Sequence, residues 1–163
     1  MIHQTVRKIC LIACVGLGLA APALADDSVP ETRSAKTSAA DQIKGEWVQY
    51  RDTAEGRYMT IKQHLGDHTI LTTYDPQQKP IYSHRSDYEV DESGDVNVFR
   101  YHSKVVLVGP NAGARSERKS AYVFRVDGDQ FYEVHGMLPG DQGRPKLAVW
   151  QRLKNSPIAK PKT

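Results

Sequence analysis

The chain has 163 residues, of which 39% are hydrophobic and 25% charged, and its formal net charge is +3 at pH 7. This length suits a single domain that can bury a core of its own. A net charge so near zero gives no electrostatic argument for a nucleic-acid or strongly acidic partner, and we expect neither.

The first 25 residues have the pattern of a secretory signal. Arg7 and Lys8 precede an apolar run at 9–19, and the sequence Ala-Leu-Ala at 23–25 is a small-x-small cleavage site. The apolar run is shorter than the ~20 residues of a membrane-spanning helix. We therefore predict a cleaved signal peptide at 1–25, no membrane span, and a periplasmic or secreted mature chain.

The signal region allows one alternative. The sequence LIAC at 11–14 resembles a bacterial lipobox, which would make Cys14 a lipidated N-terminus. Only the five uncharged residues 9–13 separate Lys8 from Cys14. This is fewer than the ~7–15 residues of a signal's apolar region, which argues against lipidation. Both cysteines, Cys10 and Cys14, lie in the signal, so the mature domain has no disulfide and depends on its core.

A flexible lead-in is predicted at 26–41, where Val29 is the only large apolar residue. Its end favours a short helical turn. Ser38 is a candidate N-cap, Asp41 stands three residues further on, and Gly45 follows the turn.

The domain itself, expected at 42–154 and followed by a disordered tail at 155–163, has the sequence texture of an all-β protein. Short aromatic and β-branched runs alternate with turn signals, and no periodic helix of ten or more residues appears. Eight strands are predicted, at 46–51, 57–64, 69–75, 81–90, 95–101, 120–126, 130–137 and 146–153. Because most connections are short, we predict a single antiparallel up-and-down sheet that closes into a β-barrel and so has no exposed edge.

Two connections carry specific expectations. Asp127-Gly128 suits a two-residue hairpin and predicts Phe124 opposite Phe131. The longest irregular stretch is 109–120, which contains three basic residues. It is either a lid at the barrel mouth that attracts an anion or a solvated loop without a role.

Gly45-Glu46-Trp47, at the start of the first strand, resembles the Gly-x-Trp signature of lipocalins and their calycin relatives. The resemblance implies that Trp47 lies at the closed end of the barrel and that a basic residue of the last strand, here Arg152, crosses its ring. Gly45 would let the backbone pack beneath that ring. The domain is short for a lipocalin and lacks the family's loop motif and C-terminal helix. We therefore describe it as lipocalin-like, similar to small exported bacterial proteins of unassigned function; the alternative is that Trp47 is an ordinary core aromatic.

The fourth predicted strand carries the candidate binding residues. Tyr82, His84, Ser86 and Tyr88 alternate along one face, whereas the other face is largely charged and should meet water. Two phenols, an imidazole and a hydroxyl would then point into the barrel, where each unpaired group costs roughly 1–3 kcal/mol. Two interpretations follow: a pocket for one small apolar or amphipathic ligand, or an internal polar network that needs no ligand.

Other polar groups give weaker indications. His64 and His68 flank a turn that contains Asp67, and imidazole and carboxylate groups are ligands that suit zinc or copper. Because the sequence has no repeated pair of such ligands, we expect no metal and no cofactor. Glu133 and His135 share a strand face and suit either an acid–base pair or a surface ion pair. Since no nucleophile or phosphate-binding motif is present, we expect a protein that is not an enzyme; the alternative, a calycin-type enzyme, would require His84, Tyr88 and Glu133 or His135 to converge in one cavity. The sequence predicts a ligand-binding barrel or, alternatively, a filled barrel that docks on another envelope protein.

Overall fold

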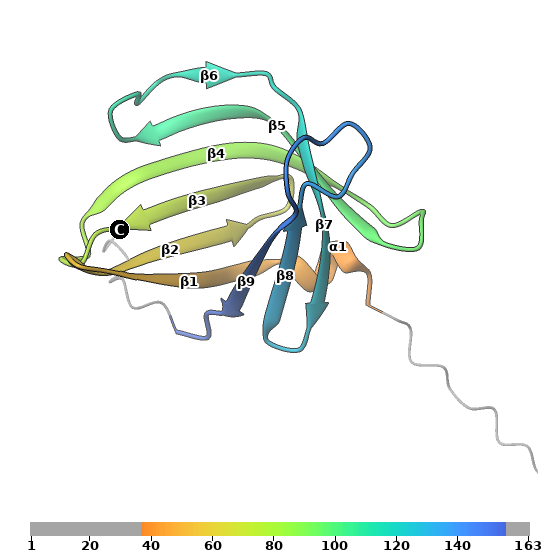
Figure 1. The fold of residues 1–163 in the computed structure, drawn as a ribbon, viewed down its shortest axis with the longest axis horizontal. Coiled ribbons are helices and arrows are strands. Elements are labelled where there is room, and N and C mark those ends of the chain that lie inside the picture. The colour runs from red at the N-terminus through yellow and green to blue at the C-terminus, as the bar shows by residue number, and fades with distance from the viewer. Residues whose placement is uncertain (1–36, 156–163) are drawn as a thin grey trace, which may run out of the picture. The chain divides into compact units, whose positions relative to one another are not determined.

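A short helix and nine strands make up residues 37–155, the part of the chain that this computed structural model describes (Figure 1). In chain order they are α1 (Ala39–Ile43), β1 (Gly45–Thr53), β2 (Gly56–His64), β3 (His68–Tyr74), β4 (Pro80–Asp91), β5 (Asn97–Val108), β6 (Arg115–Ser116), β7 (Ser120–Asp127), β8 (Gln130–His135) and β9 (Lys146–Arg152). The predicted signal peptide, most of the predicted lead-in and the tail beyond Asn155 lie outside the described residues.

The strands form one closed antiparallel barrel, as predicted. Eight of them follow chain order around the ring, each hydrogen-bonded to the next, and the two-residue strand β6 is added at the side of β5 (Figure 1). The ring closes between β9 and β1, where Trp47 stands opposite Arg152 and Val48 opposite Gln151. Short turns between consecutive strands explain this meander, because they pair each strand with its neighbour in sequence.

The turn of the β7–β8 hairpin lies one residue further along the chain than predicted, so the predicted pairing of Phe124 with Phe131 was wrong. The two residues outside the ladder are 128–129 rather than 127–128, so Val126 stands opposite Phe131 and Phe124 opposite Glu133. Phe124 and Phe131 still meet as diagonal neighbours, with ring centroids 5.7 Å apart and the rings edge to face. As a result, Glu133 of β8 stands opposite Phe124 of β7.

Strand β5 is longer than predicted and changes partner along its length. Its first part, as far as Tyr101, pairs with β7, and its second part, at Lys104 and Val105, pairs with β6. Between them Ser103 adopts φ +50°, and the register with β4 slips by one residue. This is a β-bulge, which bends the strand and changes the face to which the following side chains point. Part of the segment 109–120, predicted as irregular, is therefore a hairpin folded back on β5.

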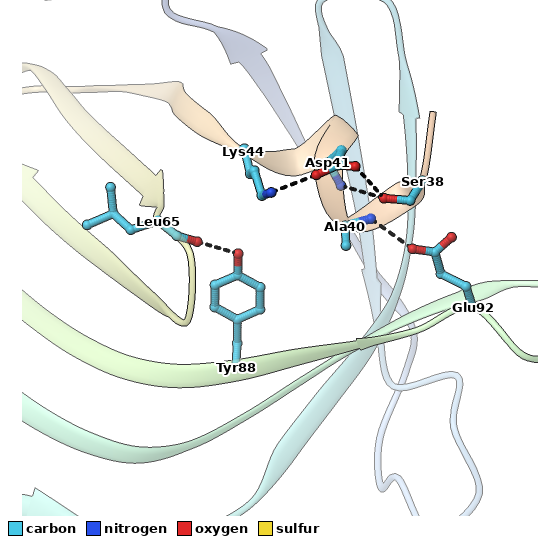
Figure 2. A network of polar contacts seen from close by, with 7 residues as sticks. All are labelled: Ser38, Ala40, Asp41, Lys44, Leu65, Tyr88 and Glu92. Atoms are coloured by element: carbon cyan, nitrogen blue, oxygen red, sulfur yellow. Dashed lines mark hydrogen bonds and ion pairs between the residues drawn. The ribbon is translucent and has the colours of Figure 1, made fainter. Parts of the chain in front are cut away.

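The helix α1 covers one end of the barrel, which we call the base. The Ser38 side chain caps the helix by accepting a hydrogen bond from the Asp41 amide at 3.0 Å, as the sequence indicated (Figure 2). The Ala40 amide donates to the Glu92 carboxylate at 2.9 Å, which ties the helix to the β4–β5 turn (Figure 2). The helix also buries Ile43 in the aromatic core. We call the opposite end, where β5 leads into the segment 109–120, the mouth.

Gly45, Trp47 and Arg152 meet at the base. The guanidinium carbon of Arg152 lies 4.1 Å from the centroid of the Trp47 ring, and the Trp47 indole N–H donates to the Ile43 carbonyl at 2.7 Å. Gly45 has φ +105°, a conformation that side chains rarely adopt, and a Cβ at this position would lie 3.5 Å from Arg152 Nη1. The arrangement has the geometry that the Gly-x-Trp resemblance implies.

Apolar side chains gather on two sides of the sheet. The interior cluster at the base is dominated by aromatic residues: Trp47, Phe99, Tyr122, Phe124, Phe131 and Trp150. A second, smaller cluster consists of Val48, Met59 and Ile61, with Tyr74 and Leu153 packed against it. Because Val48 follows the inward Trp47 and stands opposite Ile61, this second cluster lies on the outer face of the sheet.

Candidate functional site

A cavity of about 250 Å³ lies inside the barrel, between the aromatic base and the mouth. Every barrel strand except β1 contributes to its wall. The lining residues are Lys62, Thr69, Leu71, His84, Ser86, Phe99, Tyr101, Lys104, Tyr122, Glu133, His135, Ala148 and Trp150. The wall therefore combines aromatic faces with charged and hydroxyl groups. We call this space the lumen.

The four candidate residues of β4 lie at different depths. His84 and Ser86 line the lumen. Tyr88 stacks on Phe99 at the base, with centroids 4.7 Å apart, and its hydroxyl donates to the Leu65 carbonyl at 2.6 Å (Figure 2). Tyr82 lies nearer the mouth, beside a second hollow of about 430 Å³. Alternation places side chains on one face, but each pair of residues also advances about 6.6 Å along the strand, so one strand spans base, lumen and mouth.

A buried ion pair joins two strands of the lumen wall that are not hydrogen-bonded to each other. The Lys62 ammonium on β2 bonds to the Glu133 carboxylate on β8, and the two side chains are only 9% and 2% exposed. Aromatic rings surround the ammonium, the nearest being that of Trp150, whose centroid is 4.3 Å from Lys62 Nζ. Burial alone would raise the pKa of Glu133, but Lys62 and His135 lower it to about 2. Glu133 is therefore an interior anion, and the surface-pair interpretation of Glu133 and His135 is wrong.

Five buried polar side chains of the lumen lack a hydrogen-bond partner. The atoms are Thr69 Oγ1, His84 Nδ1, Ser86 Oγ, Tyr122 OH and Trp150 Nε1, none of which bonds to any group among residues 37–155. A buried polar group without a partner costs roughly 1–3 kcal/mol, and such groups in folded proteins usually find a protein, water or ligand partner. Their gathering in one cavity identifies the lumen as the candidate binding site.

Two histidines inside the barrel are held neutral. Burial lowers the pKa of His84 to about 4, and the charges of Lys104 and Lys62 add to the effect. Burial also lowers the pKa of His64 to about 3, with Lys62 again contributing. His64 lies among aromatic rings at the base, 5.1 Å from the ring of Phe99, whereas His68 pairs with Asp67 at 2.7 Å. The two histidines of this turn therefore do not converge.

The mouth of the barrel is basic. Lys104 lines both the lumen and the neighbouring 430 Å³ hollow, which Arg115 and Arg118 also border. A third hollow of about 650 Å³ also adjoins Tyr101 and is lined by Arg118 and Lys119 together with the acidic residues Glu89 and Asp141. The basic groups come from the segment 109–120 and its surroundings, so the basic residues noted in the sequence lie beside the way into the lumen.

Sequence reasoning missed Lys62, Lys104, Tyr122 and Trp150. A signal existed for the last two, since both are aromatic residues in predicted strands.

Among residues 37–155, no three histidine, cysteine, aspartate or glutamate side chains are grouped to hold a metal ion. Nor does any helix in this part of the chain have the length and apolar character to cross a membrane. Comparison with known proteins found no matching family model, no matching curated protein and no matching solved structure.

Proposed function

We propose that this protein binds one small amphipathic molecule in the lumen of its barrel. The observation that carries the proposal is the convergence of five unpartnered buried polar atoms in a single aromatic-walled cavity. Such a cavity has the general composition of a small-molecule site, with apolar walls and a few polar groups that orient the ligand. At about 250 Å³ the lumen is smaller than most ligand pockets, so the ligand is small.

The alternative of a barrel filled by its own side chains fits these observations less well. A filled interior would satisfy its polar groups internally, because each unsatisfied one reduces the free energy of unfolding. Lys62 and Glu133 bond to each other in this way. The buried polar atoms of His84, Ser86 and Trp150, in contrast, have no hydrogen-bond partner among the described residues. This contrast within one interior favours a ligand site over a purely structural barrel.

The same proposal includes export and a lipocalin-like origin. Its support is the signal-like pattern at 1–25 together with the arrangement of Gly45, Trp47 and Arg152 at the base. A binding protein of this kind would meet its ligand in the periplasm or outside the cell. The absence of cysteines beyond residue 25 is compatible with that route, because the core alone holds the barrel.

The proposal can be tested by blocking the lumen. Ala148 lines the cavity, and the adjacent Val149 is 38% exposed on the outer face of the same strand. Protein recovered natively from its source would first be analysed by native mass spectrometry for a bound molecule. Binding of two added probes, phenol and benzamide, would then be followed through Trp150 fluorescence and NMR. We expect Ala148→Leu to lose the bound molecule and the probes while still unfolding cooperatively, and Val149→Leu to behave as the wild type. Equal binding by Ala148→Leu and the wild type, or no binding by either, would overturn the proposal.

A further inference from the structure

The lumen offers more hydrogen-bond donors than acceptors. The Trp150 indole N–H can only donate, and the Lys62 ammonium has three protons, one of which is directed to Glu133. The unpartnered hydroxyls of Ser86 and Tyr122 can donate as well. Among residues 37–155 the only carboxylate in the wall is that of Glu133, which Lys62 already engages. A complementary ligand must therefore supply acceptor atoms.

The formal charges of the wall leave one positive charge unbalanced. With histidines counted as neutral, the lining that residues 37–155 provide has two ammonium groups, on Lys62 and Lys104, and one carboxylate, on Glu133. Lys62 pairs with Glu133, whereas Lys104 forms no ion pair with any residue between 37 and 155. A charge in a cavity of low dielectric constant is stabilised strongly by a partner of opposite sign. A ligand with one negative charge would make the lumen electrically neutral.

The backbone of β5 is bent in a way that points Lys104 inward. Along β5 the residues that line the lumen are Phe99, Tyr101 and then Lys104, a spacing of two followed by three. Regular alternation would place Ser103 inward and Lys104 outward. The bulge at Ser103, with φ +50°, changes the alternation and directs Lys104 to the interior. Non-glycine residues in this conformation are uncommon and gather at functional sites.

From these three observations we propose that the lumen binds a small aromatic monocarboxylate, with its carboxylate paired to Lys104 and its ring against the aromatic wall formed by Tyr101 and Trp150. The inference rests on the proposed function and adds the chemical class of the ligand. The basic residues Arg115 and Arg118 beside the mouth would raise the local concentration of such an anion. The class thus follows from charge balance, donor excess and the direction of one side chain.

The experiment compares acids with their neutral amides. Binding of benzoate and benzamide, and of phenylacetate and phenylacetamide, would be measured at pH 7 by calorimetry on the wild type and on Lys104→Met, Lys104→Arg and Lys119→Met. We expect the wild type to bind each acid at least tenfold more tightly than its amide. Lys104→Met should lose this preference through weaker binding of the acid alone, whereas Lys104→Arg and Lys119→Met should keep it.

A second readout locates the carboxylate. The imidazole of His84 lines the same cavity as Lys104, so a bound carboxylate should raise the His84 pKa, which NMR can follow during titration with and without benzoate. Binding of amides without preference for acids would overturn the inference and leave the proposed function standing. Binding of neither class would overturn both. An acid preference that survives in Lys104→Met would also overturn the assignment of Lys104.

Discussion

Arg152 crosses the ring of Trp47 and also bonds to the chain that leads into it. Its Nη1 donates to the Lys44 carbonyl at 3.0 Å and its Nη2 to the Gln42 carbonyl at 2.8 Å. One side chain of the last strand thereby holds the end of α1, the start of β1 and the indole that covers the base. Cation–π contact and hydrogen bonds from a charged donor act together at this point.

Replacing Arg152 by Met should lower the free energy of unfolding by roughly 2–3 kcal/mol, because two charge-assisted hydrogen bonds and the contact with the indole are lost. Urea unfolding followed by far-UV circular dichroism measures this. Arg125→Met is the matched control, since the Arg125 side chain is 77% exposed and its ion pair with Asp127 is long, at 3.5 Å. Equal small effects of both substitutions would show that Arg152 does not hold the base together.

Replacing Gly45 by Ala should be costly because of the backbone conformation. At φ +105° an alanine is strained by roughly 1–3 kcal/mol, and this strain comes from the backbone alone, because its Cβ would lie in ordinary van der Waals contact with Arg152. Gly66→Ala, where a Cβ would meet nothing within 4 Å, is the control and should be close to neutral. Thermal unfolding measures the stability of the two variants. A Gly45→Ala protein as stable as the wild type would show that alanine is not strained at this position.

The Lys62–Glu133 pair should behave as a coupled unit. Lys62→Met or Glu133→Gln alone leaves a buried charge without its partner, and we expect each to lower the free energy of unfolding by roughly 3–5 kcal/mol. The double substitution removes both charges and should recover much of that loss. A double-mutant cycle from urea unfolding provides the coupling, and strictly additive effects would contradict the ion pair.

Stability should fall as the pH is lowered from about 6.5, because His64 is held neutral in the folded protein. Its pKa is lowered from 6.5 to about 3, so the unfolded chain takes up a proton before the folded one does. His64→Phe should reduce the slope of unfolding free energy against pH between 6.5 and 4, by up to roughly 1.4 kcal/mol per pH unit. Urea unfolding at several pH values measures the slope. An unchanged slope in the variant would mean that His64 is not held neutral.

The bulge at Ser103 should tolerate Asn but not Val. Asn accepts the left-handed conformation, whereas a β-branched residue at φ +50° is strained by roughly 1–3 kcal/mol. We expect Ser103→Asn to retain wild-type stability and acid preference, and Ser103→Val to lose both because Lys104 is no longer held inward. Unfolding experiments and benzoate titration of the two variants provide the comparison. If a destabilised Ser103→Val protein still preferred acids, the bulge would not be what directs Lys104 inward.

The architecture could be predicted from sequence because short-range signals determine it. Turn residues between β-branched runs indicated the meander, and Ser38 with Asp41 indicated the helical cap. Alternation along β4 correctly placed His84 and Ser86 on the inward face. It could not give their depth, which depends on how far each strand extends along the barrel, and so Tyr82 and Tyr88 lie outside the lumen.

The charged part of the site was harder to predict. In β2 the apolar residues Met59 and Ile61 alternate with Lys62, and apolar residues normally face the core. Here they pack on the outer face with Val48, and Lys62 faces inward to meet Glu133. The direction of Lys104 depends on a bulge, and a serine in the sequence gives no sign of one. Both features arise from tertiary packing rather than from local pattern.

The antiparallel pairing of β1 with β9 brings the beginning and the end of the folded unit together at the base. A short peptide linking these two ends, with a new opening cut at the tight β1–β2 turn, should give a circular permutant that preserves every ladder of the barrel.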